Sequence, residues 1–289
     1  MARGSSSPSR GPVFCGWNLD ERPRLFGVLN VTPDSFSDGG QFLEVRAAVE
    51  QGSRLVEEGA DALDVGGEST RPSGRVYGPG KRELPAEEEI ARVVPVIRAL
   101  RRRFDVPISI DSRKAAVAEA ALDAGASLVN DVSGGAFDAG MLPLVARRGV
   151  PVILMHMRGT PETMASLAEY RDVRAEVAVE LAGRVDAALR AGVRREGIAV
   201  DPGLGFAKTS EQSRALLGGF EAVRSLGFPV MIGASRKSFL ARPGIPPQER
   251  VAESVAAAVA AVLGGARLLR VHDVAATARA LRRLPAGAP

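Results

Sequence analysis

The sequence is poor in the residues that build several kinds of site. Cys15 is the only cysteine among 289 residues, so no intramolecular disulfide can form. Only two histidines are present, which excludes the Cys/His spacings of zinc sites. Gly, Arg or Glu interrupts every apolar run before it reaches the roughly 20 residues of a membrane-spanning helix. These absences favour a cytoplasmic protein in a reducing compartment that binds no membrane.

The excess of positive charge is small and aromatic residues are few, whereas a nucleic-acid surface would need both. The formal net charge is only +4, and aromatic residues make up 4% of the chain. Nucleic-acid binding requires a basic face with stacking aromatics, so we expect no nucleic-acid partner. The first residues are rich in Ser, Pro, Arg and Gly and have no apolar segment. They predict a disordered tail over residues 1–11 rather than a signal peptide.

What the chain has instead is a short apolar run that recurs eight times and leads each time to a polar residue. Runs without helical spacing are typical of strands buried in a parallel sheet. The predicted strands are Leu25–Asn30, Ala62–Val65, Pro107–Asp111, Leu128–Asp131, Val152–Met155, Ile198–Asp201, Val230–Ala234 and Leu268–Val271. The polar residues are Asn30, Asp64, Asp111, Asn130, His156, Asp201, Ser235 and His272.

Helix-length segments follow the strands. They are Phe42–Glu58, Ala86–Phe104, Arg113–Ala124, Met141–Arg148, Arg174–Ala191, Ser210–Leu226, Arg250–Leu263 and Ala275–Arg282. Most of them lead to a glycine just before the next strand: Gly59, Gly125, Gly149, Gly192, Gly227 and Gly265. Glycine favours the left-handed position that ends a helix, so this repeat predicts short helix-to-strand loops.

The alternation of strands and helices predicts an α/β fold. The number of units and a length close to the roughly 250 residues of a β/α barrel predict a single-domain (β/α)8 TIM barrel over residues 12–285. A doubly wound open sheet alternates similarly, but this chain lacks the G-x-G-x-x-G that would follow its first strand. Before the first strand, Val13–Asn18, the turn-like Asp20 and Glu21, and Arg24 predict a hairpin that plugs the N-terminal mouth.

The polar strand ends predict the position of the site. In a β/α barrel they gather at the C-terminal mouth, where active sites are built. Asp111, Asn130 and Asp201 are expected to converge there, and buried carboxylates are too unfavourable to be incidental. Such acceptors suit a flat ligand with N–H donors, such as a 2-amino-4-oxo-pyrimidine edge. Two alternatives stay open, because the same residues can cap helices or bind a divalent cation.

Cationic residues follow the last two predicted strands. Lys237 lies in the Ser-Arg-Lys-Ser segment 235–238, and Arg270 and His272 lie close together at the end of the eighth strand. Barrels often bind phosphate at these two loops, where helix N-termini add N–H donors. A phosphorylated ligand is therefore expected on this side of the mouth.

Two other residues are less suited to catalysis. His156 lies beside methionines, where a histidine is more often a hydrogen-bonded structural residue, and we assign it no catalytic role. Cys15 precedes the first barrel strand and is too far from the C-terminal mouth to act as a nucleophile. Covalent catalysis is therefore disfavoured.

With these motifs in place, the sequence resembles the dihydropteroate synthases, a family of pterin-binding TIM barrels. The matching stretches are residues 27–40, 64–72, 108–112, 130–135, 155–161, 201–206, 235–238 and 270–273. Each is weak alone, but together and in this order they are highly specific. The family condenses 6-hydroxymethyl-7,8-dihydropterin diphosphate with p-aminobenzoate, which gives 7,8-dihydropteroate and pyrophosphate in folate biosynthesis. It is the target of sulfonamides.

The resemblance implies a role for each matching residue. Those that hold the pterin are Asp111, Asn130, Met155, Asp201, Lys237 and Arg270. Those that hold the diphosphate are Asn30, Thr70, Arg270 and His272, with Asn30 as the protein's contact to Mg²⁺. Those on the p-aminobenzoate side are Thr70, Arg71, Pro72, Phe206, Lys237 and Ser238, with a helix start at Ser238 for the carboxylate. The catalytic set is Asn30, Asp38, Arg71 and Lys237, which act by charge and position because the arylamine itself attacks the pterin methylene.

Two alternatives to this function stay open. A barrel that transfers a methyl group from folate to a corrinoid protein would lack the Arg270 and His272 pair. A pterin-binding paralogue without activity would not need Asp38, Arg71 and Lys237.

Two segments carry further expectations. Residues 73–85 make the second loop longer than the family commonly shows, which leaves the position of that loop open. Val251–Leu263 has a wide apolar face for the outer helix of a barrel, and this face predicts a homodimer.

Overall fold

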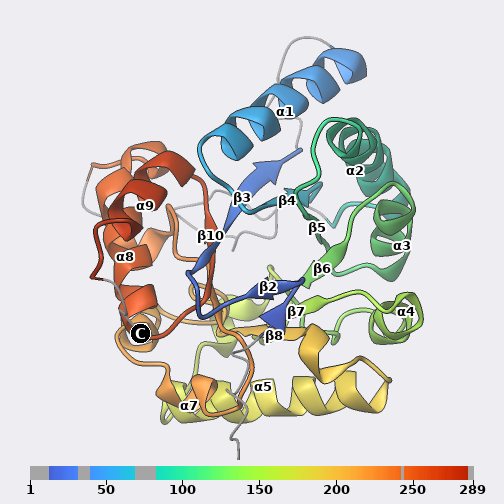
Figure 1. The fold of residues 1–289 in the computed structure, drawn as a ribbon. Helices are drawn as coiled ribbons and strands as arrows, with labels where there is room; N and C mark the ends of the chain where they lie inside the picture. The colour runs from blue at the N-terminus through green and yellow to red at the C-terminus, as the bar shows by residue number, and fades with distance from the viewer. Residues whose placement is uncertain (1–12, 32–39, 69–82, 242–243, 286–289) are drawn as a thin grey trace, which may run out of the picture.

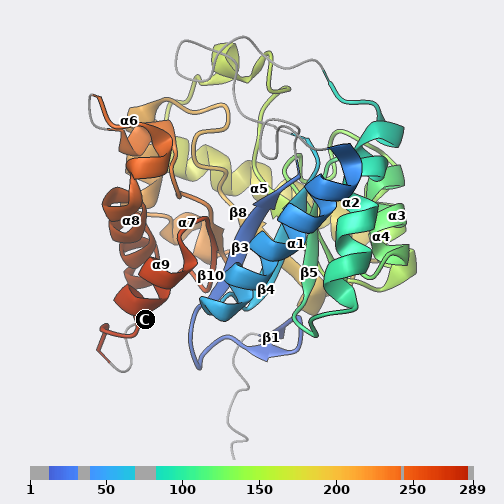
Figure 2. The ribbon, with the colours of Figure 1, turned by 90° about the horizontal axis from the view of Figure 1, so that it is seen from above.

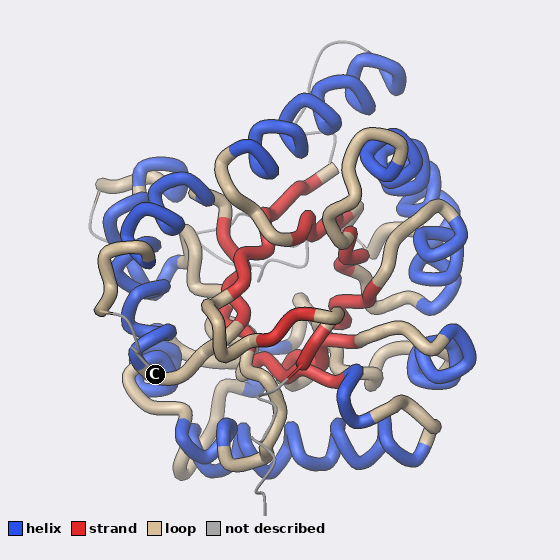
Figure 3. Tube along the Cα trace, viewed as in Figure 1, coloured by secondary structure: helices blue, strands red, loops and turns tan. Residues whose placement is uncertain are grey.

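Eight parallel strands form a barrel in the computed structural model, which describes residues 13–31, 40–68, 83–241 and 244–285. The strands are β3 (Arg24–Asn30), β4 (Ala62–Gly66), β5 (Ile108–Asp111), β6 (Leu128–Asp131), β7 (Val152–Met155), β8 (Ile198–Asp201), β9 (Met231–Ile232) and β10 (Leu268–Val271). From β3 to β8 each strand pairs with the next along the chain, and β10 lies between β3 and β9. Helices surround this ring of strands (Figures 1 and 3). The predicted TIM barrel is confirmed.

The barrel closes between β8 and β9. Val200 forms a parallel bridge with Val230, and the Val200 N–H donates to the Pro229 carbonyl at 2.9 Å. The ladder at β9 is shorter than the predicted Val230–Ala234, because the Ala234 carbonyl already accepts the Lys237 N–H at 3.2 Å and the chain turns there.

The outer helices begin and end close to the predicted residues. They are α1 (Gly40–Glu57), α2 (Ala86–Arg101), α3 (Ala115–Asp123), α4 (Met141–Arg148), α5 (Val173–Arg190), α6 (Ser210–Leu217), α7 (Glu221–Arg224), α8 (Val251–Leu263) and α9 (Val274–Leu281). The six glycines predicted to end helices all have positive φ, between 62° and 112°. None of the helices within the described ranges is long and apolar enough to cross a membrane.

The prediction of one helix over Ser210–Leu226 is wrong. The chain forms two helices there, α6 and α7, separated at Gly218 and Gly219. Each glycine disfavours a helix by about 1 kcal/mol relative to alanine, so the adjacent pair is a point where the helix ends. The break also lets Phe220 bury completely in the core.

The predicted N-terminal hairpin is present. Its strands β1 (Val13–Phe14) and β2 (Trp17–Asn18) are antiparallel, and the turn between them has positive φ at both Cys15 and Gly16, as a two-residue hairpin turn requires. Phe14 is completely buried in an apolar cluster with side chains near the beginnings of the barrel strands. Figure 2 shows β1 across one end of the barrel. The hairpin therefore closes the N-terminal mouth.

Candidate active site

One arginine links two carboxylates across the C-terminal mouth. Arg270 on β10 donates from Nε to Asp64 Oδ2 and from Nη2 to Asp111 Oδ2, both at 2.5 Å. Asn130 on β6 donates from Nδ2 to Asp64 Oδ2 at 3.2 Å. The strands that carry these residues span half of the barrel, so the fold brings predicted strand-end residues together. Asp64 is completely buried and acts as the shared acceptor behind them.

Burial alters the acid–base properties of this cluster. It raises the pKa of Asp111 above its usual range, and the nearby Arg270 guanidinium opposes that rise. Burial also raises the pKa of Asp201 on β8, while Lys237 opposes it. Perturbed carboxyl groups of this kind, gathered at one mouth with paired cations, are typical of functional sites.

Lys237 follows β9 and lies beside Asp201. Its Nζ donates to the Leu204 carbonyl and lies 4.7 Å from the centre of the Phe206 ring. Burial lowers the pKa of Lys237 to about 8, and the Asp201 carboxylate acts in the opposite direction. The Gly203 N–H donates to Asp201 Oδ1 at 2.7 Å. An ammonium, a carboxylate and an aromatic ring therefore share one side of the mouth.

The segment that carries Lys237 is fixed to the end of β10. Ser235 Oγ lies 3.1 Å from His272 Nδ1 and accepts the His272 N–H at 3.2 Å. Arg236 donates from Nη2 to Asp273 Oδ1 at 2.6 Å and from Nε to Asp273 Oδ2 at 3.1 Å. Arg236 has a φ of 59°, a strained value for a residue with a side chain. The two predicted cationic loops are thus held against each other.

The structure also gives the positions of two further predicted site residues. Asn30 ends β3 next to Gly66 of β4, and Met155 ends β7, buried against Met164 and Ala207. Asp38, Thr70, Arg71 and Pro72 lie outside the described residues, as do the predicted tail and most of the long segment after Pro72.

A helix does begin at Ser238, as predicted. It is a 3₁₀ helix of only three residues, Ser238–Leu240. The Pro-Gly sequence at positions 243 and 244 disfavours a longer helix here. A turn this short offers few aligned N–H groups to a carboxylate.

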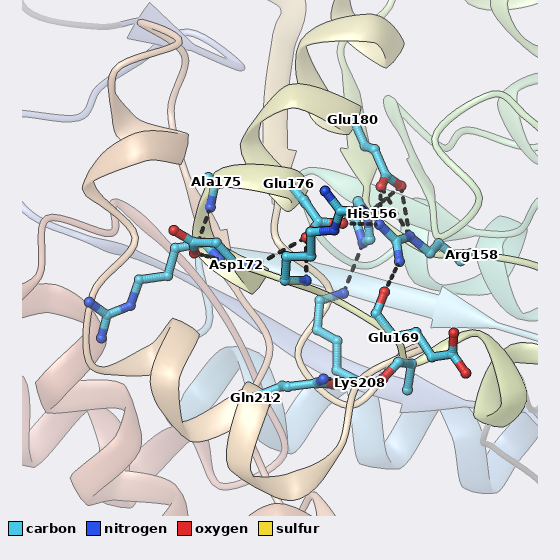
Figure 4. Close-up of polar contacts among 12 residues, drawn as sticks. His156, Arg158, Glu169, Asp172, Ala175, Glu176, Glu180, Lys208 and Gln212 are labelled. Atoms are coloured by element: carbon cyan, nitrogen blue, oxygen red, sulfur yellow. Dashed lines mark hydrogen bonds and ion pairs between the residues drawn. The ribbon is translucent and has the colours of Figure 1, made fainter.

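His156 lies in a second polar cluster behind the mouth (Figure 4). Its ring is completely buried, with Nε2 3.0 Å from Glu180 Oε2 and Nδ1 2.8 Å from Lys208 Nζ. Burial, reinforced by Lys208, lowers the pKa of His156 well below its usual range, so the ring is neutral. Sequence reasoning missed Lys208 and Glu180, because nothing in the linear sequence shows that these residues meet His156.

The site offers few metal ligands of its own. Among the described residues no three His, Cys, Asp or Glu side chains form a group that would hold a metal ion. Mg²⁺ usually keeps several waters and binds one or two protein oxygens together with substrate phosphates. The single amide oxygen of Asn30 at the end of β3 fits an ion that arrives with a diphosphate.

Taken together, the barrel and the paired carboxylates and cations at its C-terminal mouth define the class of the protein: a TIM barrel with the kind of site that enzymes of this fold build there. A family model described as "Pterin binding enzyme" matches residues 26–272. The dihydropteroate synthase of Synechocystis is 44% identical over 271 residues, which cover 93% of this chain and 91% of that protein. The Escherichia coli K12 dihydropteroate synthase is 40% identical over 269 residues, with 92% and 93% covered.

A solved structure agrees with these sequence matches. Xanthomonas albilineans dihydropteroate synthase with 4-aminobenzoic acid has a TM-score of 0.84 at 45% identity, and the match covers 93% of this chain and 96% of that one. The chain belongs to the pterin-binding enzymes and, within them, to the dihydropteroate synthase family.

Proposed function

We propose that the protein condenses 6-hydroxymethyl-7,8-dihydropterin diphosphate with p-aminobenzoate and releases 7,8-dihydropteroate and pyrophosphate in folate biosynthesis. The observation that carries this proposal is the meeting of the acceptors Asp111, Asn130 and Asp201 with the cations Lys237 and Arg270 at one mouth. The X. albilineans relative in complex with 7,8-dihydropteroate and the Yersinia pestis relative with a sulfonamide drug support it.

The pterin ring binds among the strand ends. The Asp201 carboxylate accepts two N–H bonds from the 2-amino edge of the ring, while Asp111 and Asn130 meet its other polar atoms. Lys237 donates to the pterin from the same side as Asp201, and Met155 packs against the ring. Because Asp64 and Asp111 fix the plane of the Arg270 guanidinium, that plane is ready to stack on the pterin face.

The diphosphate lies toward the ends of β3 and β10. Arg270 and His272 bind its oxygens, with Ser235 orienting the His272 ring through Nδ1. By the resemblance to the family, Asn30 and Thr70 would complete this end, and Asn30 would hold the Mg²⁺ ion. When bound, Mg²⁺ neutralises charge on the diphosphate oxygens.

The reaction needs no nucleophile from the protein. The bond between the pterin methylene and the diphosphate oxygen breaks, and its electron pair leaves with pyrophosphate. The arylamine nitrogen forms the new C–N bond and then releases one proton to water. The residues accelerate this exchange by position and charge: Arg270 and His272 face the leaving group, and Asp38 shields the methylene.

p-Aminobenzoate binds on the Lys237 side of the mouth. The Phe206 ring forms one wall, and Lys237, already 4.7 Å from that ring, lies at its edge. Ser238 and the second-loop residues Thr70, Arg71 and Pro72 complete this subsite.

A direct assay tests the proposed function. Purified protein is incubated with the pterin diphosphate, p-aminobenzoate and Mg²⁺, and pyrophosphate and dihydropteroate are measured together. We expect the two products in equal amounts. The absence of both products from wild-type protein would contradict the proposal.

We also propose that the protein acts as a cytoplasmic homodimer formed through α8. The outer face of α8 is made of small and apolar side chains: Ala252, Val255, Ala256, Val259, Ala260 and the half-exposed Leu263. Pairing two such faces removes apolar surface from water. Light scattering of the wild type should give twice the mass of one chain, and Val259→Glu should give one. A monomeric wild type at micromolar concentration would contradict the dimer.

A further inference from the structure

The loop of residues 203–206, after β8, contacts two of the ligand-facing side chains. The Gly203 N–H donates to Asp201 Oδ1 at 2.7 Å, and the Leu204 carbonyl accepts from Lys237 Nζ. The loop also carries Phe206, whose ring lies against the same ammonium. A displacement of this loop would therefore move Phe206 and release Lys237.

The backbone of this loop has an unusual conformation. Gly203 and Gly205 have positive φ, and so does Ala207, at 47°. The left-handed conformation is disfavoured by about 1 kcal/mol for a residue with a Cβ. Gly203 also packs so closely on β7 that an added Cβ would lie 2.0 Å from the His156 carbonyl oxygen. Contacts from outside the loop must hold this conformation.

Lys208 supplies those contacts from the far side of the loop. Its buried Nζ donates to the Gly203 carbonyl at 3.1 Å and to the Phe206 carbonyl at 2.9 Å. These carbonyls belong to the first and last residues of the loop, so one ammonium fixes both ends. The third acceptor is His156 Nδ1 at 2.8 Å. Burial lowers the pKa of Lys208 well below its usual range, but three acceptors around Nζ require three N–H donors, so the geometry fits the ammonium form.

The His156 ring is itself oriented to accept that bond. Its Nε2 lies 3.0 Å from Glu180 Oε2, and an ionised carboxylate can only accept, so Nε2 carries the hydrogen and Nδ1 is the acceptor. Arg158 fixes Glu180 by donating from Nε to Oε1 at 3.0 Å. Figure 4 shows this chain of contacts from α5 to Lys208.

A second contact holds the middle of the loop. The Gly205 N–H donates to Ser213 Oγ on α6 at 3.1 Å, and Ser213 Oγ donates to the Thr209 carbonyl at 2.8 Å. Ser213 is completely buried. Lys208 and Ser213 thus fix the same loop independently.

We propose that Lys208 is a positioning residue for the p-aminobenzoate subsite. Because its ammonium donates to the carbonyls of Gly203 and Phe206, Lys208 fixes the positions of the Phe206 ring and of Lys237. His156 in turn orients Lys208. The proposal rests on the proposed function for the identity of the ligand. Pterin binding depends on it less, because Asp111, Asn130 and Asp201 all lie on barrel strands and only Lys237 is shared between the two subsites.

The variant Lys208→Met tests the proposal, because it keeps an unbranched side chain and removes the three donors. We expect KM for p-aminobenzoate to rise at least about tenfold, the factor that corresponds to roughly 1.4 kcal/mol. The Kd of the pterin diphosphate should rise by a smaller factor than this KM, because the pterin keeps its contacts with Asp111, Asn130 and Asp201. An equal or larger factor for the pterin would contradict a role centred on the p-aminobenzoate subsite. An unchanged KM with only kcat reduced would overturn the proposal, because loss of folded protein gives that result.

A second variant covers the case in which Lys208→Met does not fold. Ser213→Ala removes the other contact, and KM for p-aminobenzoate should rise about two- to fivefold, as expected for loss of one hydrogen bond. Ser53→Ala is the matched control, because Ser53 is also buried and its hydroxyl donates to the Val49 carbonyl within α1, far from the loop. Equal KM values for Ser213→Ala and Ser53→Ala would contradict the proposal.

Hydrogen exchange measures the loop without turnover. Amides of residues 203–207 should exchange at least about tenfold faster in Lys208→Met, because the loop opens more often, while β4 amides stay unchanged. Unchanged loop exchange would overturn the positioning role. A wild type that makes no dihydropteroate would instead contradict only the proposed function, so the two failures are distinguishable.

Discussion

The two mouths of the barrel are built from the same eight strands but differ completely in chemistry. At the N-terminal mouth, Phe14 and Leu19 of the hairpin segment are buried against apolar strand residues. At the C-terminal mouth, Arg270 joins buried carboxylates, and Lys237 lies beside Asp201. The comparison shows that one end of each strand contributes to stability and the other end to function, as is general for β/α barrels.

Cavity size does not reveal this division. A cavity of about 410 Å³ lies at the N-terminal side, next to Cys15, and one of about 330 Å³ lies next to His272. Burial raises the pKa of the Cys15 thiol to about 12, so it stays protonated and unreactive. The larger cavity therefore holds no reactive thiol, while the smaller one lies among residues of α1, α8 and α9 and reaches the proposed diphosphate end only at His272.

The largest expected effect is the loss of pterin binding in Asp201→Ala. A buried carboxylate that accepts two ligand N–H bonds contributes enough that its removal should weaken binding by at least roughly 100-fold. Calorimetric titration with the pterin diphosphate measures this, with Phe14→Ala as the control at the other mouth. If the two variants lose equal affinity, the functional contrast between the mouths does not hold.

The next effect is on stability alone. Phe14→Ala should lower the free energy of unfolding by about 3–5 kcal/mol, because it removes a completely buried ring and leaves a cavity. KM and kcat per folded molecule should stay at wild-type values. Denaturant unfolding and steady-state kinetics on the same preparation test this, and an altered KM would show that the plug influences the site.

A smaller effect, with opposite signs for binding and stability, is expected from pH. Pterin binding needs Lys237 protonated, so affinity should fall as pH rises through about 8. Because the pKa of Lys237 is lowered from 10.5 in the folded state, the unfolded chain binds more protons between these values. The contribution of Lys237 to stability should therefore rise over the same range. Pterin affinity and the free energy of unfolding are measured at each pH for the wild type and for Lys237→Met. If both quantities changed in the same direction in the wild type, or if Lys237→Met kept both trends, the prediction would be wrong.

The smallest effect is expected for His156→Ala. Lys208 keeps its two carbonyl acceptors without the ring, so most activity should remain, within about fivefold of wild type. Steady-state kinetics measure this. If His156→Ala abolished activity while Asp201→Ala did not, the assignment of the site would be wrong.

Local signals in the sequence predict much of this molecule. The six glycines predicted to end helices, of which Gly59 is the first and Gly265 the last, mark helix ends because glycine readily adopts positive φ. The strand ends at Asp111, Asn130 and Asp201 predict the C-terminal mouth from topology alone. Gly218 and Gly219 are a local signal of the same kind, because two adjacent glycines favour the end of α6 over one continuous helix.

Long-range pairings are what the sequence does not reveal. Arg270 and Asp64 are 206 positions apart, and nothing near either residue specifies the other. Nothing in the sequence distinguishes Lys208 from a surface lysine. Its role depends on the Gly203 and Phe206 carbonyls and the His156 ring, which only the folded barrel places around it. These contacts decide orientation within the site, so the residues of the site are more predictable than their geometry.

A crystal structure with bound 7,8-dihydropteroate tests most directly the claim that function belongs to the C-terminal mouth. The account predicts the pterin edge against Asp111, Asn130 and Asp201, with the benzoate part beside Phe206 and Lys237. A product molecule seated next to Cys15 at the N-terminal mouth, or one whose pterin does not contact Asp201, would contradict it.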